Sequence, residues 1–388
     1  MPKSRVADVR DAIVVTAAVW VLALALWLDV RFMGAILGRI STDAMNVHGD
    51  FDTFWRSARA FWEGEEVYAT GADLENLNPP FWVLLISPFG LLEPLVAYRF
   101  FVLITLSTSV AYLAWVADEL RLRAAWAVIG GVMLILSSPL LATLALGQIY
   151  PFLAFGLVVA WIADRREMHT VSGAALGLVV ALKPSLAPML LWPLVRRRWG
   201  AFWAAIVAGA AATLLGAVVV GFGATLDWLR LLSQSGASPY WDNASLPSAA
   251  ARLFTDNPYA QHVATWKWMV PLAYALGIAV VAVTAARARW DADAGLWALV
   301  AASLLVSPIA WHNYLVLLGP GILLLLARER VALAFLLLAL QAIPGQWPLL
   351  WSQEGTVAAT LALTLYLYIL IAHWVVLLPG RKEPARGE

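Results

Sequence analysis

The chain has 388 residues, of which 62% are hydrophobic and 13% charged, and its formal net charge is +1. Soluble domains are nearer half apolar and a quarter charged, so this composition predicts an integral membrane protein. The small net charge gives no bulk field that would attract nucleic acid. The absence of cysteine excludes disulfides, cysteine–zinc sites and thiol catalysis.

The first apolar stretch, Ala12 to Trp27, could be misread as a signal peptide. No small-residue cleavage site follows it, and Asp29 and Arg31 come next. We therefore expect a retained first spanning helix. A helix needs about 20 apolar residues to cross the hydrocarbon core. About twelve candidates lie along the chain, at 12–29, 80–96, 100–117, 125–145, 149–163, 171–194, 201–222, 268–286, 292–307, 313–327, 331–346 and 356–378.

Several of these stretches are short or interrupted by proline, as at Pro139, Pro184, Pro188 and Pro308. Such breaks are tolerated where the backbone faces protein or a water-filled cavity. The sequence thus predicts an all-α polytopic membrane protein, with residues 1–388 forming one integral membrane domain.

Lysine and arginine concentrate on the cytoplasmic side of membrane proteins. Basic residues mark both chain ends, at Lys3, Arg5, Arg10, Arg381, Lys382 and Arg386. With an even number of spans, both termini are cytoplasmic, and the polar segments 30–79 and 223–267 both lie outside. Three further basic turns then fall inside, at 196–198, 287–289 and 328–330.

Two basic turns disagree with this topology, at 121–123 and 165–166, because they land outside. Either acidic neighbours offset these charges, or the stretch 125–195 contains short hairpins that do not fully cross.

The first outer segment contains an amphipathic pattern between His48 and Tyr68. Its apolar side chains recur at helical spacing, at Phe51, Phe54, Trp55, Ala58, Phe61 and Trp62. Arg56, Arg59 and Glu63 take the other face. This pattern predicts a helix lying in the membrane interface.

Asp50 begins that helix and has two interpretations. It could be the N-cap, accepting the free N–H groups of the first turn. It could also be a carboxylate held at the outer membrane face as a general base. The next polar motif, Asn78-Pro79-Pro80-Phe81, is explained by a turn followed by a proline in the first helical turn.

Two polar interruptions lie within apolar runs. Gly147-Gln148 is one, and Lys183-Pro184-Ser185 is the other. An ionisable residue at membrane depth is costly and therefore suggests function. Lys183 could neutralise the phosphate of a lipid-linked leaving group, or its ammonium could simply reach the interface.

The second outer segment and the span end near residue 310 carry further polar groups. Asn243-Ala244-Ser245 formally matches a glycosylation sequon, and Arg252 follows it. His312 lies at the outer end of a span, where it could bind a phosphate or a sugar hydroxyl, or merely be solvated.

Several common motifs are missing from the sequence, including a P-loop, GxGxxG and HExxH. Asp50-Phe51-Asp52 is the nearest approach to a DxD motif, and no histidine–carboxylate pairing at helical spacing suggests a metal. The polar residues gather at one face, which disfavours a transporter with a midplane substrate path.

At these residues the sequence resembles glycosyltransferase family 87, the polyprenol-phosphate-mannose-dependent mannosyltransferases of the GT-C superfamily. The similarity runs through about 50–320. The matching pieces are Gly49-Asp50-Phe51 with Phe54-Trp55, Gly64 to Tyr68, Asn78 to Phe81, Gly147-Gln148, Gly173 to Pro184, Arg197-Arg198-Trp199, Asn243 to Arg252, and Ser307-Pro308 to Tyr314. Asn78 departs from the family's usual tyrosine.

The resemblance implies a GT-C-type bundle of about 12 helices in the plasma membrane, with its active site on the outer face. It also implies an inverting transferase that moves mannose from a polyprenyl-phosphate donor to a glycolipid acceptor such as a phosphatidylinositol mannoside. No cofactor or metal is expected. Asp50 matches the family's base, with Asp52 as the alternative.

The remaining site residues follow from residue matching and charge. His312 matches a polar residue near the lipid phosphate, and Lys183 and Gln148 match recurrent positions. The expected substrate-binding set is His312, Lys183, Gln148, Arg56, Arg59, Asn78, Asn243 and Arg252. Two alternatives stay open, namely an arabinosyl or glucosyl donor for the same architecture, and a non-enzymatic lipid or solute transporter.

Overall fold

A computed structural model describes residues 36–344 and 355–380, together with separate positions between 9 and 27. Thirteen of the 18 residues of the first expected span, 12–29, are described, and the other five lie outside the described residues. The basic residues of both chain ends also lie outside them, as do Asp29 and Arg31.

The described chain is built from helices. In chain order they are α2 (Ile36–Ser41), η1 (Met45–His48), α3 (Gly49–Glu63), α4 (Pro80–Ile86), η2 (Ser87–Leu91), α5 (Pro94–Glu119), α6 (Ala124–Ile135), α7 (Ser138–Leu146), α8 (Tyr150–Arg165), α9 (His169–Leu182), η3 (Pro184–Leu190), α10 (Leu191–Val195), α11 (Trp199–Val220), α12 (Phe222–Gln234), α13 (Leu246–Phe254), α14 (Met269–Ala288), α15 (Ala292–Val306), η4 (His312–Leu318), α16 (Gly319–Ala327), α17 (Val331–Gln341), α18 (Val357–Leu363) and α19 (Leu365–Leu377).

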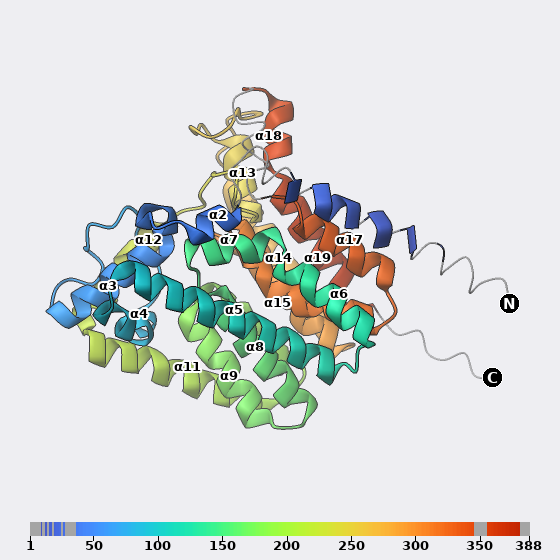
Figure 1. Ribbon diagram of the computed structural model, residues 1–388, viewed down its shortest axis with the longest axis horizontal. Helices are drawn as coiled ribbons and strands as arrows, with labels where there is room; N and C mark the ends of the chain where they lie inside the picture. Colours follow the sequence, from blue (N-terminus) through green and yellow to red (C-terminus); the bar gives the residue numbers. More distant parts are fainter. Residues whose placement is uncertain are drawn as a thin grey trace.

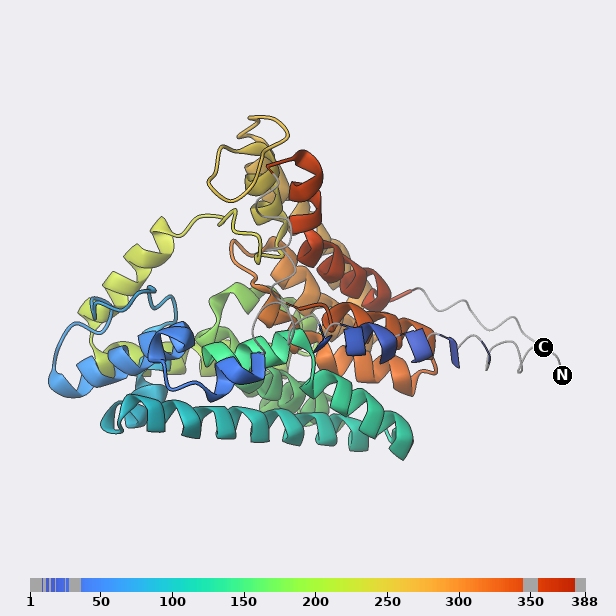
Figure 2. The same ribbon diagram turned by 45° about the horizontal axis from the view of Figure 1, so that its top comes forward.

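The all-α polytopic membrane fold is confirmed. Within the described ranges there is no strand, and one isolated antiparallel bridge joins Asn243 to Trp311. Figures 1 and 2 show the bundle from two directions, with α13 and α18 projecting from the same end.

Helix length alone identifies fewer spans than the sequence predicts. In the described part of the chain, three helices are long and apolar enough to cross a membrane, namely α5, α11 and α14, and two bent pairs, α6 with α7 and α18 with α19, would bring the number to five. The other apolar helices are shorter, partly because proline interrupts them, as at Pro184, the first residue of η3. The count of about twelve stays a prediction.

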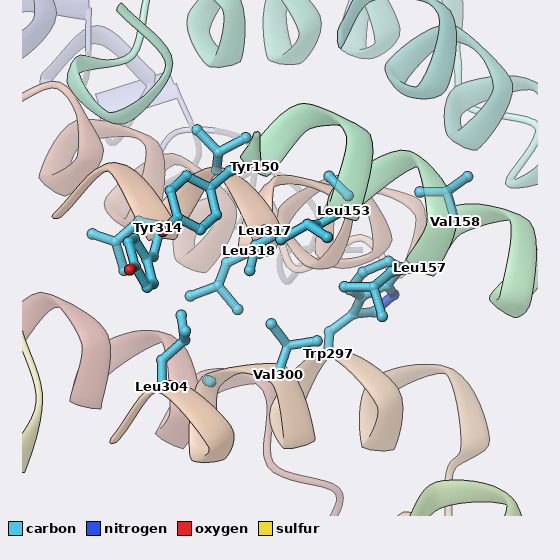
Figure 3. Packing of buried hydrophobic residues seen from close by; sticks show 14 of the residues in the cluster. Tyr150, Leu153, Leu157, Val158, Trp297, Val300, Leu304, Tyr314, Leu317 and Leu318 are labelled. Atoms are coloured by element: carbon cyan, nitrogen blue, oxygen red, sulfur yellow. The ribbon is translucent and has the colours of Figure 1, made fainter. Parts of the chain in front are cut away.

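The core centres on α15, where every residue from Ala294 to Leu305 is buried. Trp297 on this helix meets Trp161 of α8 edge to face, with ring centroids 6.1 Å apart. Figure 3 shows Trp297 and Val300 facing Leu157 and the neighbouring apolar side chains. Such aromatic pairs add to the energy of apolar burial.

Helices α9 and α11 pack with their backbones almost touching. A Cβ added to Gly173 would lie 2.0 Å from the carbonyl oxygen of Ala201, and one added to Gly177 would lie 2.2 Å from that of Ala205. The spacing Gly-x-x-x-Gly on α9 faces Ala-x-x-x-Ala on α11, which is the small-residue pattern of helix pairs in membranes.

Ion pairs join the turns at one end of the bundle. Glu119 at the end of α5 accepts hydrogen bonds from Arg165 and Arg166, and Arg165 also pairs with Asp293. Arg328 after α16 pairs with Asp291. This set of basic turns is called the arginine face below; its turns lie at 119–123, 164–169, 196–199, 287–293 and 328–330.

The arginine face resolves the two conflicting basic turns. Arg165 and Arg166 lie on the same side as Arg328, and Arg196 joins them by pairing with Asp164 at 2.8 Å. The expectation that 121–123 and 165–166 land opposite the other basic turns is therefore wrong. Between these turns the chain forms hairpins that return to one face, and the acidic neighbours Glu119 and Asp164 pair with the arginines of the turns.

We expect Gly177→Leu to destabilise the protein by about 3 kcal/mol, because the new side chain would overlap the α11 backbone. Thermal unfolding of the detergent-solubilised protein measures this. Gly131→Leu on α6 is the matched control, since nothing lies within 4 Å of a Cβ placed there. Equal unfolding midpoints for the two variants would contradict the close packing of α9 and α11.

Candidate active site

A cavity of about 1350 Å³ lies at the end of the bundle opposite the arginine face. Helices α8, α9 and α15 connect the two. Tyr150 at the start of α8 lines the cavity, whereas Arg165 at its end belongs to the arginine face. At 1.5 Å per residue, the 16 residues of α8 separate them by about 24 Å.

Asp50 lies in the cavity wall at the start of α3. The amphipathic helix is confirmed, with Phe51, Phe54 and Ala58 buried. Its N-cap position is His48, which makes no side-chain capping bond, and Asp50 lies inside the first turn. The interpretation of Asp50 as the N-cap is therefore wrong, and its carboxylate is left to face the cavity.

Gln148 lies in the turn between α7 and α8, beside Asp50. Gly147 has a φ of +76°, and a Cβ there would lie 2.4 Å from the Cβ of Phe51. Only glycine allows both this backbone conformation and this approach. The turn therefore presses against α3, and the Gln148 side chain hydrogen-bonds the Asp50 carboxylate.

Burial raises the pKa of Asp50 from 3.8 to about 6. The Gln148 hydrogen bond and the positive charge of Lys183 act in the opposite direction, and Asp242 adds a smaller upward effect. Desolvation therefore dominates, which is typical of a carboxylate kept as a proton acceptor near neutral pH.

Lys183 enters the cavity wall where α9 breaks before Pro184. Its ammonium lies 5.0 Å from the ring centroid of Tyr314 and 5.8 Å from that of Tyr150. Figure 3 shows the two tyrosine rings against each other, with centroids 4.0 Å apart. Among the described residues no carboxylate forms an ion pair with Lys183, so its charge is available to an anionic ligand.

Asp242 and His312 form a second polar pair in the cavity wall. His312 Nδ1 lies 2.5 Å from Asp242 Oδ1, and the His312 backbone N–H donates to the Asp242 carbonyl at 3.0 Å. The His312 ring is 5.0 Å from that of Tyr366, centroid to centroid.

Asn243 and Arg252 hold the loop that carries Asp242, and neither lines the cavity. The Asn243 amide donates to the Pro308 carbonyl at 2.9 Å and accepts from the Ala310 N–H at 2.9 Å. Arg252 is fully buried and donates to the carbonyls of Tyr240 and Asn243. Burial lowers the pKa of Arg252 to about 10.

The cavity brings together Asp50, Gln148, Lys183, His312 and Asn78 from the expected set. Asn78 is buried, and its backbone N–H donates to the Asn76 side chain at 3.1 Å. The substrate-binding roles of these residues stay predictions.

The two arginines of α3 lie elsewhere. Arg56 pairs with Asp52 at 2.7 Å, Arg59 pairs with Glu63, and neither arginine lines the cavity. Arg59 is half exposed. This arrangement favours Asp50 over Asp52 as a base, because Asp52 is engaged outside the cavity.

Sequence reasoning did not single out several cavity residues. Asp242 is the most important of them, and Tyr150, Tyr240 and Asn313 also line the cavity. A signal for Asp242 was present, since it directly precedes Asn243-Ala244-Ser245. In the described ranges no three histidine, aspartate or glutamate side chains gather as metal ligands would. Metal independence stays a prediction.

The sequence matches known proteins over most of its length. A polyprenol-phosphate-mannose-dependent alpha-(1-2)-phosphatidylinositol mannoside mannosyltransferase from Mycobacterium tuberculosis is 29% identical over 323 residues, covering 75% of this chain and 74% of that protein. An alpha-(1->3)-arabinofuranosyltransferase from Corynebacterium glutamicum is 24% identical over 336 residues, covering 81% and 74%.

Among solved structures, ArnT from Cupriavidus metallidurans bound to undecaprenyl phosphate aligns with a TM-score of 0.36 and 16% identity, over 95% of this chain and 76% of that one. The sequence profile of Glycosyltransferase family 87 matches residues 76–308, which is more than half of the chain. The chain therefore belongs to glycosyltransferase family 87 and is a membrane glycosyltransferase.

Proposed function

We propose that this protein transfers a sugar from a polyprenyl-phosphate donor to a lipid-linked glycan acceptor, and that the sugar is mannose. Support comes from the family and from relatives named for a polyprenol-phosphate-mannose donor. The observation that carries the proposal is Asp50, a carboxylate with a raised pKa in the wall of a large cavity. A phosphatidylinositol mannoside is the acceptor that the relatives suggest.

The chemistry is a single displacement at the anomeric carbon. The acceptor hydroxyl attacks, its proton passes to Asp50, and the electron pair of the breaking C–O bond goes to the polyprenyl phosphate. Inversion would turn a β-linked donor into an α-linked product. A positioned base contributes roughly 10²–10⁴-fold to such a rate.

Lys183 and His312 would stabilise the departing phosphate. Both line the cavity that also contains Asp50, and Lys183 has no competing ion pair among the described residues. Fixed charges aimed at the developing anion are worth more inside a cavity than in water. The leaving group is a phosphate, so the step needs no nucleotide and no obligatory metal.

An arabinosyl donor is the second candidate, since several relatives are arabinofuranosyltransferases. A glucosyl donor has no relative among those named here. Membership of a glycosyltransferase family leaves the transporter alternative without support.

We further propose a plasma-membrane location with the cavity on the outer face and both termini cytoplasmic. The arginine face supports this orientation, because basic turns favour the cytoplasm. Exposed apolar side chains on the long helices, such as Leu103, Val207 and Ile278, would contact membrane lipids.

The transfer reaction is tested with purified protein in nanodiscs, radiolabelled polyprenyl-phosphate-mannose and a glycolipid acceptor extract. Asp50→Asn should lower kcat at least 100-fold, because the proton acceptor is lost. Asp52→Asn on the same helix is the matched control and should stay near wild type. Activity of Asp50→Asn close to wild type would rule out Asp50 as the base. Parallel donors carrying arabinose or glucose identify the sugar, and chelator in the assay tests for a metal.

The pH dependence of kcat/KM provides an independent check. Asp50 must be deprotonated to act, so the rate should fall about tenfold per pH unit below about pH 6 and level off above it. Gln148→Met should move this inflection to higher pH, because the Gln148 hydrogen bond lowers the pKa of Asp50. A flat profile between pH 4.5 and 7 would be incompatible with this assignment.

Orientation is testable because the chain has no native cysteine. Glu65→Cys after α3 should react with a membrane-impermeant maleimide in intact cells. Arg330→Cys in the arginine face should react only after permeabilisation. Both positions are exposed in the folded protein. The reverse labelling pattern would place the cavity on the cytoplasmic side.

A further inference from the structure

Asp242 and His312 come from segments 70 residues apart in number, and several bonds fix them together. The His312 backbone N–H donates to the Asp242 carbonyl, and the Ala244 N–H donates to the Ala310 carbonyl at 2.7 Å. These two bonds form a short antiparallel bridge between the loop and the start of η4. The carboxylate of Asp242 thus meets the imidazole through a rigid backbone contact.

Buried hydrogen bonds hold the loop on its other side. Arg252 donates to the carbonyls of Pro239, Tyr240 and Asn243, at 3.0, 2.7 and 2.9 Å. It also donates to Thr364 Oγ1 at 3.1 Å. Arg252 is fully buried, and its donors hold the carbonyls of residues 239–243 in one conformation. Asp242 is the carboxylate of this loop that lines the cavity.

The two nitrogens of His312 have different surroundings. Nδ1 makes an ion-pair contact with Asp242 Oδ1 at 2.5 Å, whereas Nε2 is buried and has neither an ion-pair nor a hydrogen-bond partner among the described residues. The side chain is 6% exposed and lines the cavity. A buried imidazole N–H left without a partner is costly, so Nε2 is the atom available to a ligand.

We propose that Asp242 is a positioning residue that acts through His312. Its carboxylate pairs with Nδ1–H and orients the imidazole so that Nε2–H donates to an oxygen of the leaving phosphate. The proton stays on His312, the donor's C–O electron pair goes to the phosphate, and the acceptor's proton goes to Asp50. This inference rests on the proposed function and names a residue beyond it.

The other charged groups around the pair are compatible with this role. Lys183 and Asp50 line the same cavity, Arg252 lies behind the loop, and Tyr240 and Tyr366 pack beside Asp242 and His312. Asp73, Glu75 and Arg39 also line this cavity, so four carboxylates and two cationic side chains surround it together with His312. Because Asp242 is engaged with Nδ1, it is not a competing base for the acceptor hydroxyl.

A double-mutant cycle distinguishes positioning from a general structural role. The probe is undecaprenyl monophosphate in nanodiscs, and the signal is the fluorescence of Trp241 and Trp311, which line the cavity. The variants are Asp242→Asn, Asp242→Ser, His312→Gln and the double changes. Asp227→Asn is the matched control, since Asp227 lies on the exposed face of α12 and pairs with Arg230.

We expect each single change to weaken binding about tenfold or more, the usual cost of losing a charge-assisted hydrogen bond. In the His312→Gln background, the Asp242 changes should add almost nothing, because the partner through which Asp242 acts is gone. The loss should be smaller for a mannosyl phosphodiester lipid, which carries less phosphate charge than the monophosphate. Asp227→Asn should bind like wild type.

Additive losses in the double variants, or equal losses for the monophosphate and the phosphodiester, would overturn the positioning role while leaving the transferase proposal intact. Wild-type protein that binds neither lipid would overturn the proposed donor class as well. Using both Asp242→Asn and Asp242→Ser, each with its unfolding midpoint measured, separates a folding defect from a binding defect.

Discussion

The approach of the α7–α8 turn to α3 is the contact on which the site depends. Gly147 lies where any Cβ would overlap Phe51, so the Gln148 side chain reaches the Asp50 carboxylate. A carboxylate in an apolar bundle would otherwise be neutralised by desolvation. The Gln148 hydrogen bond and the nearby Lys183 limit that effect, and the pKa of Asp50 settles near 6. The close packing at Gly147 thereby influences the pKa of Asp50, because it places Gln148 beside the carboxylate.

The breaks in the helices also place polar side chains at the cavity. Helix α9 stops before Pro184, which leaves Lys183 at the cavity, and α15 gives way at Ser307 to the segment that carries His312. Irregular backbone is stable at membrane depth only beside protein or a water-filled space. At the opposite ends of α8, α9 and α15, the turns of the arginine face are joined by ion pairs.

Much of this could be predicted from residue type and local spacing. The helix 49–63, the proline start of α4 and the polar interruptions at Gln148 and Lys183 are local signals. The polar groups at these signals all line the cavity, namely Asp50, Asn78, Gln148 and Lys183. The two arginines could also have been separated from Asp50. At about 100° per residue, Arg59 lies about 180° around the helix from Asp50. Charge alone suggested Arg59, whereas helical periodicity argued against it.

The position of Asp242 beside His312 could not be predicted from local sequence. Its contact with His312 depends on a bridge between two segments that are distant in sequence, and on a buried arginine that fixes the loop from behind. Arg252 and Asn243 looked like ligands because polar groups in apolar surroundings suggest function. In the structure they satisfy backbone carbonyls and amides instead. Arg252 and Asn243 therefore act indirectly. They hold the loop that places the Asp242 carboxylate beside the His312 imidazole.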